Sequence, residues 1–199
     1  MKRLPFADRE QAVAALSAAA EEVDRGGVLL LPTESFYGLG ADPRRAAAVE
    51  RIRAMKARPP GLDLPVLCAD WEQVEALVVV PESHRVRLSR LWPAALTVVL
   101  PSRAEIAATS GATLAVRIPA HALLRALLYR VGPLTGTSAN RHGDPPCTEV
   151  DGALRSLAEE PDLVLDAGPT AGGEPSTLVD LIAARPRILR PGASVWDEL

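Results

Sequence analysis

The chain reads Val28-Leu29-Leu30-Leu31-Pro32-Thr33-Glu34-Ser35-Phe36-Tyr37-Gly38-Leu39-Gly40, a continuous apolar run followed at once by polar residues and glycines. The run Val28–Leu31 is short and free of polar residues, which is typical of a buried strand. The segment Pro32–Asp42 then predicts a loop, in which Thr33 supplies a hydroxyl and Glu34 a carboxylate. Because ligands bind at the carboxyl ends of strands in open α/β sheets, this loop is a candidate binding site. Aromatic packing in an ordinary strand-to-helix loop would explain it equally well.

Helical and apolar segments alternate on both sides of this stretch. The segment Asp8–Asp24 is rich in alanine, leucine and glutamate, and it predicts a helix that Asp8 caps and Gly26 ends. Asp42-Pro43 begins a second predicted helix, which runs to about Met55. The other predicted strands are Leu64–Ala69, Leu96–Leu100, Leu114–Ile118, Leu134–Thr137, Leu163–Leu165, Thr177–Ile182 and Arg187–Leu189. The other predicted helices begin after Asp70 and at Pro81, and two more span His121–Val131 and Glu149–Glu159.

This alternation of helices and strands predicts an α/β protein. The sequence contains no internal repeat and no low-complexity tract, and its 199 residues fit one domain. We therefore expect a single domain over residues 1–199, with its core at about residues 8–192. The order of the elements alone allows a doubly wound parallel sheet as well as a mixed one.

The composition excludes several classes of protein. Hydrophobic residues make up 48% of the chain and charged residues 24%, which excludes a disordered chain, and every apolar run ends before the roughly 18 residues of a membrane span. The N-terminus lacks an apolar signal-peptide region, and Cys68 and Cys147 lie far apart, so we expect a cytoplasmic protein with no membrane partner. A net charge of −3 does not favour general nucleic-acid binding, so an anion site must be local.

Two scarce residue types draw attention to particular positions. Lysine occurs only at Lys2 and Lys56, and asparagine only at Asn140, while arginine supplies nearly all the other basic side chains. The codon bias of a GC-rich genome explains the scarcity. A lysine or asparagine kept against that bias is weak evidence that the position needs that side chain.

The segment Lys56-Ala57-Arg58 places two cations at the end of a predicted helix. Residues i and i+2 do not share a helical face, so the two side chains converge only if the chain leaves the helix there. Pro59 favours that exit. The segment is either a phosphate clamp, with lysine as a point charge and arginine as a fork, or a pair of cations at a helix C-terminus.

Four further segments place polar or charged groups within or beside predicted strands. Thr135–Asn140 is a cluster of hydroxyls, a glycine and the asparagine, which suits either phosphate and ribose oxygens or a capped turn. Arg117 lies in a strand that is otherwise apolar, so it needs a buried acid or a ligand carboxylate as its partner. The segments Gly172–Thr177 and Arg190-Pro191-Gly192 are weaker candidates of the same kind.

Several familiar chemistries have no motif in this chain. There is no GxxxxGK[ST] segment of a P-loop enzyme and no GxGxxG segment after a strand. The cysteines and histidines lack metal-ligand spacing, so we expect no metal site built from protein side chains. No Gly-x-Ser-x-Gly segment indicates a serine hydrolase.

Five segments, in this order and spacing, resemble the YrdC/TsaC family of L-threonylcarbamoyladenylate synthases, and the resemblance covers roughly residues 28–192. Each motif is short, but the ordered set is specific. The segments are Pro32–Gly40, similar to the family's Pro-Thr-Glu-x-x-Tyr/Phe-Gly; Lys56-Ala57-Arg58-Pro59, similar to Lys-x-Arg-Pro; Leu91-Trp92-Pro93 with Leu96-Thr97; Ala115–Pro119; and Ser138-Ala139-Asn140.

The resemblance implies a fold and a reaction. The family fold is a single α/β domain with a twisted mixed parallel and antiparallel sheet, flanking helices and a deep, positively lined cleft. In the family reaction, L-threonine, bicarbonate and ATP give L-threonylcarbamoyl-AMP and pyrophosphate. Transfer proteins then carry the threonylcarbamoyl group to tRNA, with which the synthase itself could make at most a weak contact.

The resemblance also implies roles for individual residues. Lys56, Arg58, Ser138 and Asn140 would be the catalytic, ATP-binding residues. Thr113 and Arg190 would make further ATP contacts. Threonine would be bound by Thr33, Arg117 and Ser176, with Arg117 on its carboxylate. We expect Mg²⁺ to arrive with ATP, because transfer from a triphosphate usually needs a bridging cation.

The chain departs from the family pattern at several positions. Leu62-Asp63-Leu64 replaces the common Asn-Pro-Leu, and Leu67 stands where many members have histidine. One ATP contact and one threonine contact of the family are therefore not assured by the sequence. In addition, Ala94-Ala95 replaces Gly-Pro, and Pro175-Ser176-Thr177 replaces Glu-Ser-Thr.

Three other functions remain open at this point. A paralogue of the same fold could bind RNA, ribosomes or nucleotide without making the adenylate, although such paralogues tend to lose the Lys-x-Arg and Ser-x-Asn motifs. A carbamoyladenylate domain of hydrogenase maturation normally lies in a longer chain with zinc-finger-like cysteines. An unrelated nucleotide-binding module would bind ATP without threonine-dependent turnover.

Overall fold

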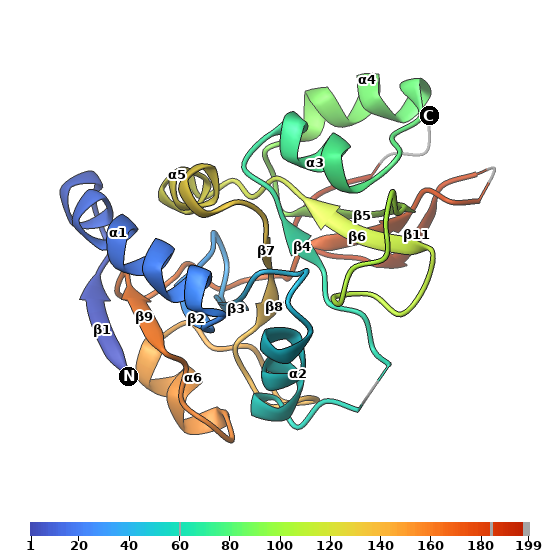
Figure 1. Cartoon of the computed structure of the whole chain (residues 1–199). Helices are drawn as coiled ribbons and strands as arrows, with labels where there is room; N and C mark the ends of the chain where they lie inside the picture. Colours follow the sequence, from blue (N-terminus) through green and yellow to red (C-terminus); the bar gives the residue numbers. More distant parts are fainter. Residues whose placement is uncertain (60, 184, 197–199) are drawn as a thin grey trace.

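The computed structural model describes residues 1–59, 61–183 and 185–196, and Figure 1 shows the arrangement of their helices and strands. The helices are α1 (Arg9–Arg25), α2 (Ala46–Met55), α3 (Trp71–Leu77), α4 (Glu82–Leu91), α5 (Ala122–Val131) and α6 (Val150–Ser156). The strands are β1 (Lys2–Pro5), β2 (Leu29–Pro32), β3 (Tyr37–Gly40), β4 (Val66–Leu67), β5 (Leu96–Pro101), β6 (Thr113–Arg117), β7 (Leu134–Thr135), β8 (Thr137–Ser138), β9 (Leu163–Asp166), β10 (Thr177–Asp180) and β11 (Arg187–Arg190).

The strands form two mixed sheets. One sheet has the order β1-β9-β2-β3-β8, and the other has the order β11-β10-β5-β6-β4-β7. In the first, β9 runs parallel to β1 and β2, whereas β3 is antiparallel to β2 and β8. In the second, β5 is parallel to β10 and antiparallel to β6. The α/β class and the mixed pairing are confirmed, and the doubly wound alternative is wrong.

Between β7 and β8, the chain passes from one sheet to the other at a single glycine. β7 pairs with β4 in one sheet and β8 pairs with β3 in the other (Figure 1), and Gly136 is the residue between the two strands. A Cβ atom on Gly136 would lie 2.6 Å from Cδ2 of Leu67, so only glycine lets the strand pack against this leucine. Leu67 is fully buried in the core. The position at which many family members have histidine is therefore occupied here by a packing residue.

Helix α1 forms for the reasons the sequence predicted. The carboxylate of Asp8 accepts a hydrogen bond from the backbone N–H of Gln11, and Gly26 ends the helix in the left-handed conformation. Its buried residues recur every three or four positions, so one face packs on the first sheet and on α5. The residues of that face are Ala12, Ala15, Ala19 and Val23.

One predicted loop is a strand. The segment predicted as loop, Pro32–Asp42, contains β3, which forms an antiparallel hairpin with β2. The sequence did not predict β3 because this strand contains two glycines, and glycine is uncommon in strands. In the structure, a Cβ atom on Gly40 would lie 2.5 Å from Cδ2 of Leu31, so glycine makes room for the neighbouring strand.

Other boundaries also differ from the predictions. The helix predicted from Asp42 begins at Ala46, and Arg45 precedes it without a side-chain cap. The strand predicted over Leu64–Ala69 is paired only at β4. Strand β1 was not predicted, because Lys2–Pro5 has no apolar pattern and is held by pairing with β9.

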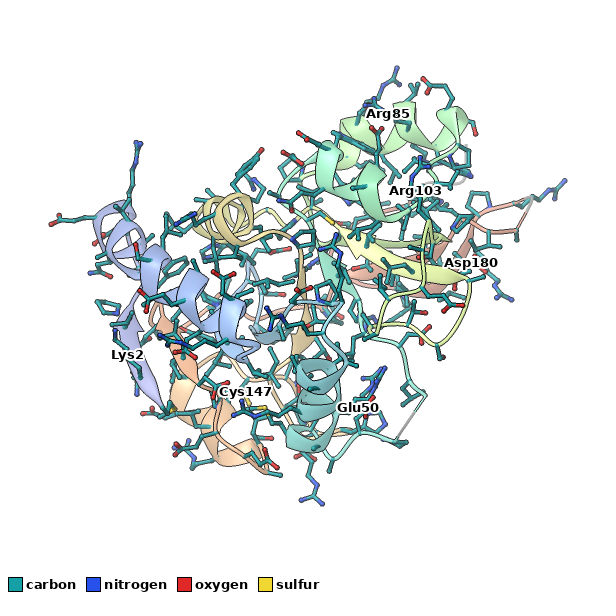
Figure 2. The ribbon with its side chains drawn as sticks, viewed as in Figure 1. Lys2, Glu50, Arg85, Arg103, Cys147 and Asp180 are labelled. Atoms are coloured by element: carbon teal, nitrogen blue, oxygen red, sulfur yellow. The ribbon has the colours of Figure 1, made fainter. Side chains whose placement is uncertain are left out.

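Two arginines fasten α3 to its surroundings, and Figure 2 labels both. Nε of Arg85, on α4, lies 2.6 Å from the carboxylate of Glu75 on α3. Nε of Arg103, in the segment between β5 and β6, donates to the backbone carbonyl of Glu75 at 2.6 Å. The helices α3 and α4 thus form one layer beside the second sheet (Figure 1).

The segment after β11 lies against the backbone that precedes β10. The N–H of Ala193 donates to the carbonyl of Pro175 at 2.9 Å, and the hydroxyl of Thr177 donates to the carbonyl of Ser194 at 2.5 Å. A Cβ atom on Gly192 would overlap the carbonyl oxygen of Pro175 and lie 2.8 Å from the carbonyl carbon of Ser176. Glycine is therefore required at position 192.

Gly192→Ala is expected to lower the free energy of unfolding by about 2 kcal/mol or more, because two backbone segments must separate to admit the methyl group. Urea denaturation measures the change. Gly111→Ala is the matched control, since a Cβ atom there meets nothing within 4 Å, and it should change stability little. Equal losses in the two variants would contradict the steric explanation.

Candidate active site

A cavity of about 480 Å³ lies between the two sheets. One side is formed by residues of β5, β6, β10 and β11, and the other by residues of β3 and β8. Seven of the nine predicted site residues line it. They are Thr33, Arg58, Thr113, Arg117, Ser138, Ser176 and Arg190.

Strand alternation explains which residues of β6 reach the cavity. Thr113, Ala115 and Arg117 line it, whereas the intervening Leu114 and Val116 are buried in the core. The neighbouring strand β5 contributes Thr97 and Val99 to the same side, because Val99 pairs with Ala115. Thr97, Val99 and Ala115 were not predicted to belong to the site. Counting alternate positions outward from Arg117 would have found Ala115.

Lys56 does not line the cavity. Its side chain is only 2% exposed, and its ammonium group donates to the backbone carbonyls of Ser138 and Asn140, the second at 2.8 Å. Burial and, to a lesser extent, the nearby charge of Arg58 lower the pKa of Lys56 to about 8. Lys56 therefore fixes the backbone of the Ser138–Asn140 loop through hydrogen bonds and does not itself line the cavity.

Asn140 also lies outside the cavity lining. Its side-chain N–H groups donate to the carbonyls of Arg141 and Asp144, each at 2.8 Å. Its Oδ1 atom is buried and has no hydrogen-bond partner among the described residues. The role predicted for Asn140 in direct ATP contact stays a prediction, and the structure places its side chain in the loop itself.

A left-handed residue separates Lys56 from Arg58. Helix α2 ends at Lys56, and Ala57 follows with φ of 46°. The N–H of Ala57 donates to Ala54 and the N–H of Arg58 donates to Arg53, each at 2.9 Å, which is the Schellman pattern of a helix end. The chain thus leaves the helix where the sequence predicted. Of the two cations, only Arg58 reaches the cavity.

Arg117 has a buried acid as its partner. Its Nη1 lies 3.0 Å from Oε1 of Glu34, with 7% and 18% of the respective side chains exposed. The other oxygen of Glu34 is buried without a partner among the described residues. Burial lowers the pKa of Arg117, and the carboxylate of Glu34 opposes that shift. The sequence predicted either a buried acid or a ligand carboxylate as the partner of Arg117. The structure shows that the partner is Glu34, and Arg117 also lines the cavity.

The other predicted threonine contacts are held in local networks. The hydroxyl of Thr33 donates to the carbonyl of Phe36 at 2.7 Å and so closes the β2–β3 turn. The hydroxyl of Ser176 lies 2.9 Å from the hydroxyl of Thr97. Nη2 of Arg190 donates to the carbonyl of Ser176 at 2.7 Å. Since Thr97 stands opposite Arg117 in the register of β5 and β6, Ser176 and Arg190 lie toward the Arg117 end of the cavity.

The cavity is suited to anions. Arg58, Arg117 and Arg190 face it, while Asp63 contributes one carboxylate. Burial lowers the pKa of each of these arginines, yet guanidinium groups keep their charge at neutral pH. Cations that are partly removed from water attract a phosphate or carboxylate more strongly than exposed ones do. The fold and site thus define an α/β protein with an arginine-lined cavity between two mixed sheets.

Comparison with known proteins places the chain in a family. The family model Sua5/YciO/YrdC, described as "Telomere recombination", matches residues 21–192. The chain belongs to this family, as its motifs indicated.

Relatives with assigned names agree with that placement. A Mycobacterium leprae protein, provisionally named threonylcarbamoyl-AMP synthase, is 37% identical over 94% of this chain and 86% of its own length. The threonylcarbamoyl-AMP synthase of Bacillus subtilis is 34% identical over 92% of this chain, which spans only 55% of that protein.

Solved structures agree in fold. The Pyrococcus abyssi Sua5 structure with L-threonine has a TM-score of 0.89 and 32% identity over 96% of this chain, which spans 58% of that protein. Escherichia coli YciO has a TM-score of 0.86 and 25% identity, with 98% of both chains covered. None of the helices in the described part of this chain has the length and apolar character needed to cross a membrane.

Proposed function

We propose that this protein is a threonylcarbamoyl-AMP synthase, which converts L-threonine, bicarbonate and ATP into L-threonylcarbamoyl-AMP and pyrophosphate. The observation that carries the proposal is the cavity, which gathers three arginines and several hydroxyls from seven separate segments of the chain. The named relatives and the L-threonine in the Pyrococcus abyssi structure support it.

The cavity has room for two reactants at its two ends. Thr113 and Arg117 occupy opposite ends of β6, about 13 Å apart for four steps of a strand. Arg58 and Thr113 suit the nucleotide, with Ser138 on the facing sheet. Arg117, Ser176 and Thr33 suit the amino acid. Arg117 binds the threonine carboxylate with those guanidinium N–H groups that do not contact Glu34.

Arg190 is assigned to the α-phosphate of ATP in this proposal. It donates to the backbone carbonyl of Ser176, and its charge acts on Arg117. In the proposed reaction, the amine of threonine and bicarbonate form a carbamate and water. A carbamate oxygen then attacks the α-phosphorus of ATP, and pyrophosphate leaves. Arg190 is placed to bind the α-phosphate, on which charge develops during this step.

The site works by positioning and charge stabilisation. Phosphorus transfer of this kind needs aligned reactants and fixed positive charge more than a covalent intermediate. Mg²⁺ supplies charge neutralisation on the triphosphate. Asp63 is the carboxylate among the residues that line the cavity, and a cage of protein ligands would need more of them. The donor set therefore fits an ion that enters with ATP, as proposed.

The biological context follows from the product. A threonylcarbamoyl adenylate is an activated donor, so transfer proteins that carry the group to tRNA are the proposed partners. We place the protein in the cytoplasm, and any contact of its own with tRNA is weak. A paralogue that binds RNA, ribosomes or nucleotide without synthesis is the alternative.

Pyrophosphate release tests the proposal. The purified protein is incubated with ATP and Mg²⁺, with and without L-threonine and bicarbonate, and the adenylate is identified by mass spectrometry. We expect release that requires both co-substrates. ATP binding without release would favour the paralogue or binding-module alternative, and RNA binding would then be measured.

A further inference from the structure

Asp63 stands where the chain departs from the Asn-Pro-Leu pattern of many family members, and its side chain joins two loops at the edge of the cavity. Its Oδ1 accepts from the N–H of Ser110 at 2.8 Å and from the hydroxyl of Ser110 at 3.1 Å. Its Oδ2 accepts from the hydroxyl of Thr109 at 3.0 Å. The carboxylate thus ties the loop after Arg58 to the loop between β5 and β6.

These bonds extend to two predicted ATP-binding residues. Nη2 of Arg58 donates to the backbone carbonyl of Asp63 at 3.0 Å, and Nε of Arg58 is buried without a partner among the described residues. The hydroxyl of Thr109 also lies 2.8 Å from the carbonyl of Thr113, so its single proton is shared between that carbonyl and Oδ2 of Asp63. A hydrogen-bonded path therefore runs from Arg58 through Asp63 to Thr113, along one end of the cavity.

We propose that Asp63 is a positioning residue for the nucleotide, and that it acts by fixing Arg58 and Thr113 relative to each other. The inference rests on the proposed function, in which these two residues contact ATP. If the backbone carbonyl of Asp63 moves, the Arg58 guanidinium loses its fixed position. It must then be immobilised when ATP binds, and the entropy lost in doing so weakens binding. The amino-acid end, around Arg117, does not take part in the path.

The fold does not depend on the carboxylate. The N–H of Leu64 donates to the carbonyl of Ala108 at 2.8 Å, and the N–H of Ala108 donates to the carbonyl of Pro43 at 3.0 Å. The first bond joins the same two loops through the backbone, the second joins the β5–β6 loop to the segment before α2, and both remain when the Asp63 side chain is removed. The loss of the carboxylate therefore alters the geometry of the loops rather than the fold.

Asparagine can replace the carboxylate in this network. Its carbonyl oxygen accepts from Ser110, and its N–H donates to the hydroxyl of Thr109, which still donates to the carbonyl of Thr113. Asp63→Asn therefore keeps the contacts and removes the charge, whereas Asp63→Ala removes both. Asp42→Ala is a matched control, since Asp42 also accepts a loop N–H, from Arg44, and lies outside the cavity lining.

The experiment measures binding of ATP with Mg²⁺ by calorimetry, together with KM for ATP and for L-threonine. For Asp63→Ala we expect the Kd and KM for ATP to rise about tenfold, while KM for L-threonine and the melting temperature change little. Asp63→Asn and Asp42→Ala should bind ATP within twofold of the wild type. This split between the substrates distinguishes positioning from general structural damage.

Other outcomes would overturn the inference. If Asp63→Ala bound ATP as tightly as the wild type, the hydrogen-bonded path would not contribute to ATP binding. If Asp63→Asn weakened ATP binding as much as Asp63→Ala, the charge of Asp63 and not its contacts with the loop would be responsible. A wild-type protein that fails to bind ATP also contradicts it. Calorimetry measures ATP binding without turnover. If the wild type bound ATP but released no pyrophosphate in a threonine-dependent way, that result would contradict the proposed function and not the role of Asp63 in ATP binding.

Discussion

Lys56→Met is expected to reduce adenylate formation more than 100-fold, the largest effect of any single substitution outside the cavity lining. The carbonyls of Ser138 and Asn140 lose a charged donor, and a hydrogen bond to a charged group contributes about 1.5–3 kcal/mol. The Ser138 carbonyl still accepts from the N–H of Asn140 at 3.1 Å, so only the Asn140 carbonyl is left without a donor among the described residues. The lowered pKa of Lys56 shows that burying the ammonium is itself unfavourable, which offsets part of this cost. The net loss of stability is about 1–3 kcal/mol.

This result differs from the expectation for a simple phosphate clamp. A lysine that only contacted ATP could be removed without harm to the fold. Lys56 is instead buried in the fold, and its loss allows Ser138 to move away from the cavity. The predicted consequence is a lower kcat together with weaker ATP binding, because the loop carries the Ser138 hydroxyl on its cavity side.

Lys2→Met is the matched control, because Lys2 is the other lysine of the chain and its side chain is exposed. Pyrophosphate release and urea denaturation are measured for both variants. Full activity of Lys56→Met would contradict the role assigned to the ammonium group. A comparable loss in Lys2→Met would point to a general effect of the substitution.

The stability difference between the wild type and Lys56→Met depends on pH. The pKa of Lys56 is lowered from 10.5 to about 8 in the folded protein, so between these values the unfolded chain binds more protons. Stability contributed by this group therefore rises as pH increases from about 8 to about 10.5. Denaturation curves of both proteins at pH 7.5 and 10 measure the difference, which isolates Lys56 from other groups. A difference that falls with pH would contradict the burial of a charged lysine.

Arg117→Gln is expected to raise the L-threonine requirement more than 100-fold and to leave ATP binding nearly unchanged. The variant removes the cation proposed for the threonine carboxylate. It also leaves Glu34 as a partly buried carboxylate without a partner for either oxygen, which costs about 3 kcal/mol of stability. Activity and stability should therefore both fall, for separate reasons.

The double variant Glu34→Gln with Arg117→Gln separates the two effects. It removes the uncompensated charge, so stability should recover by a large part of what Arg117→Gln loses. The threonine requirement should stay high, because the guanidinium is still absent. Melting curves and KM values for both substrates provide the measurements. If the double variant regained normal threonine use, Arg117 would have only a structural role.

The sequence predicted the helices and most strands where local signals are strong. Asp8 and Gly26 bound α1 as expected, because a side-chain cap and a left-handed glycine act within a few residues. It also predicted the departure from helix α2 after Lys56. It missed β3, since Gly38 and Gly40 give no local strand signal and are held by their partners β2 and β8.

The candidate site, too, was predicted only in part from the sequence. The family resemblance implied nine site residues, and seven of them line one cavity although they come from distant parts of the chain. It did not show that Lys56 faces away from the cavity. Nor did it identify Asp63 as a link between two loops, because that role depends on Thr109 and Ser110, more than 40 residues away.

What the sequence by itself determined is the α/β class, the family and the chemical types gathered for the reaction, because periodicity, caps and motif spacing are properties of neighbouring residues. Only the tertiary structure decided that the strands form two sheets joined at Gly136, that Arg117 pairs with Glu34, and which side chains reach the cavity. These features depend on which distant segments meet. Burial and pairing, not residue type, then decide whether a cation contacts a ligand or the backbone.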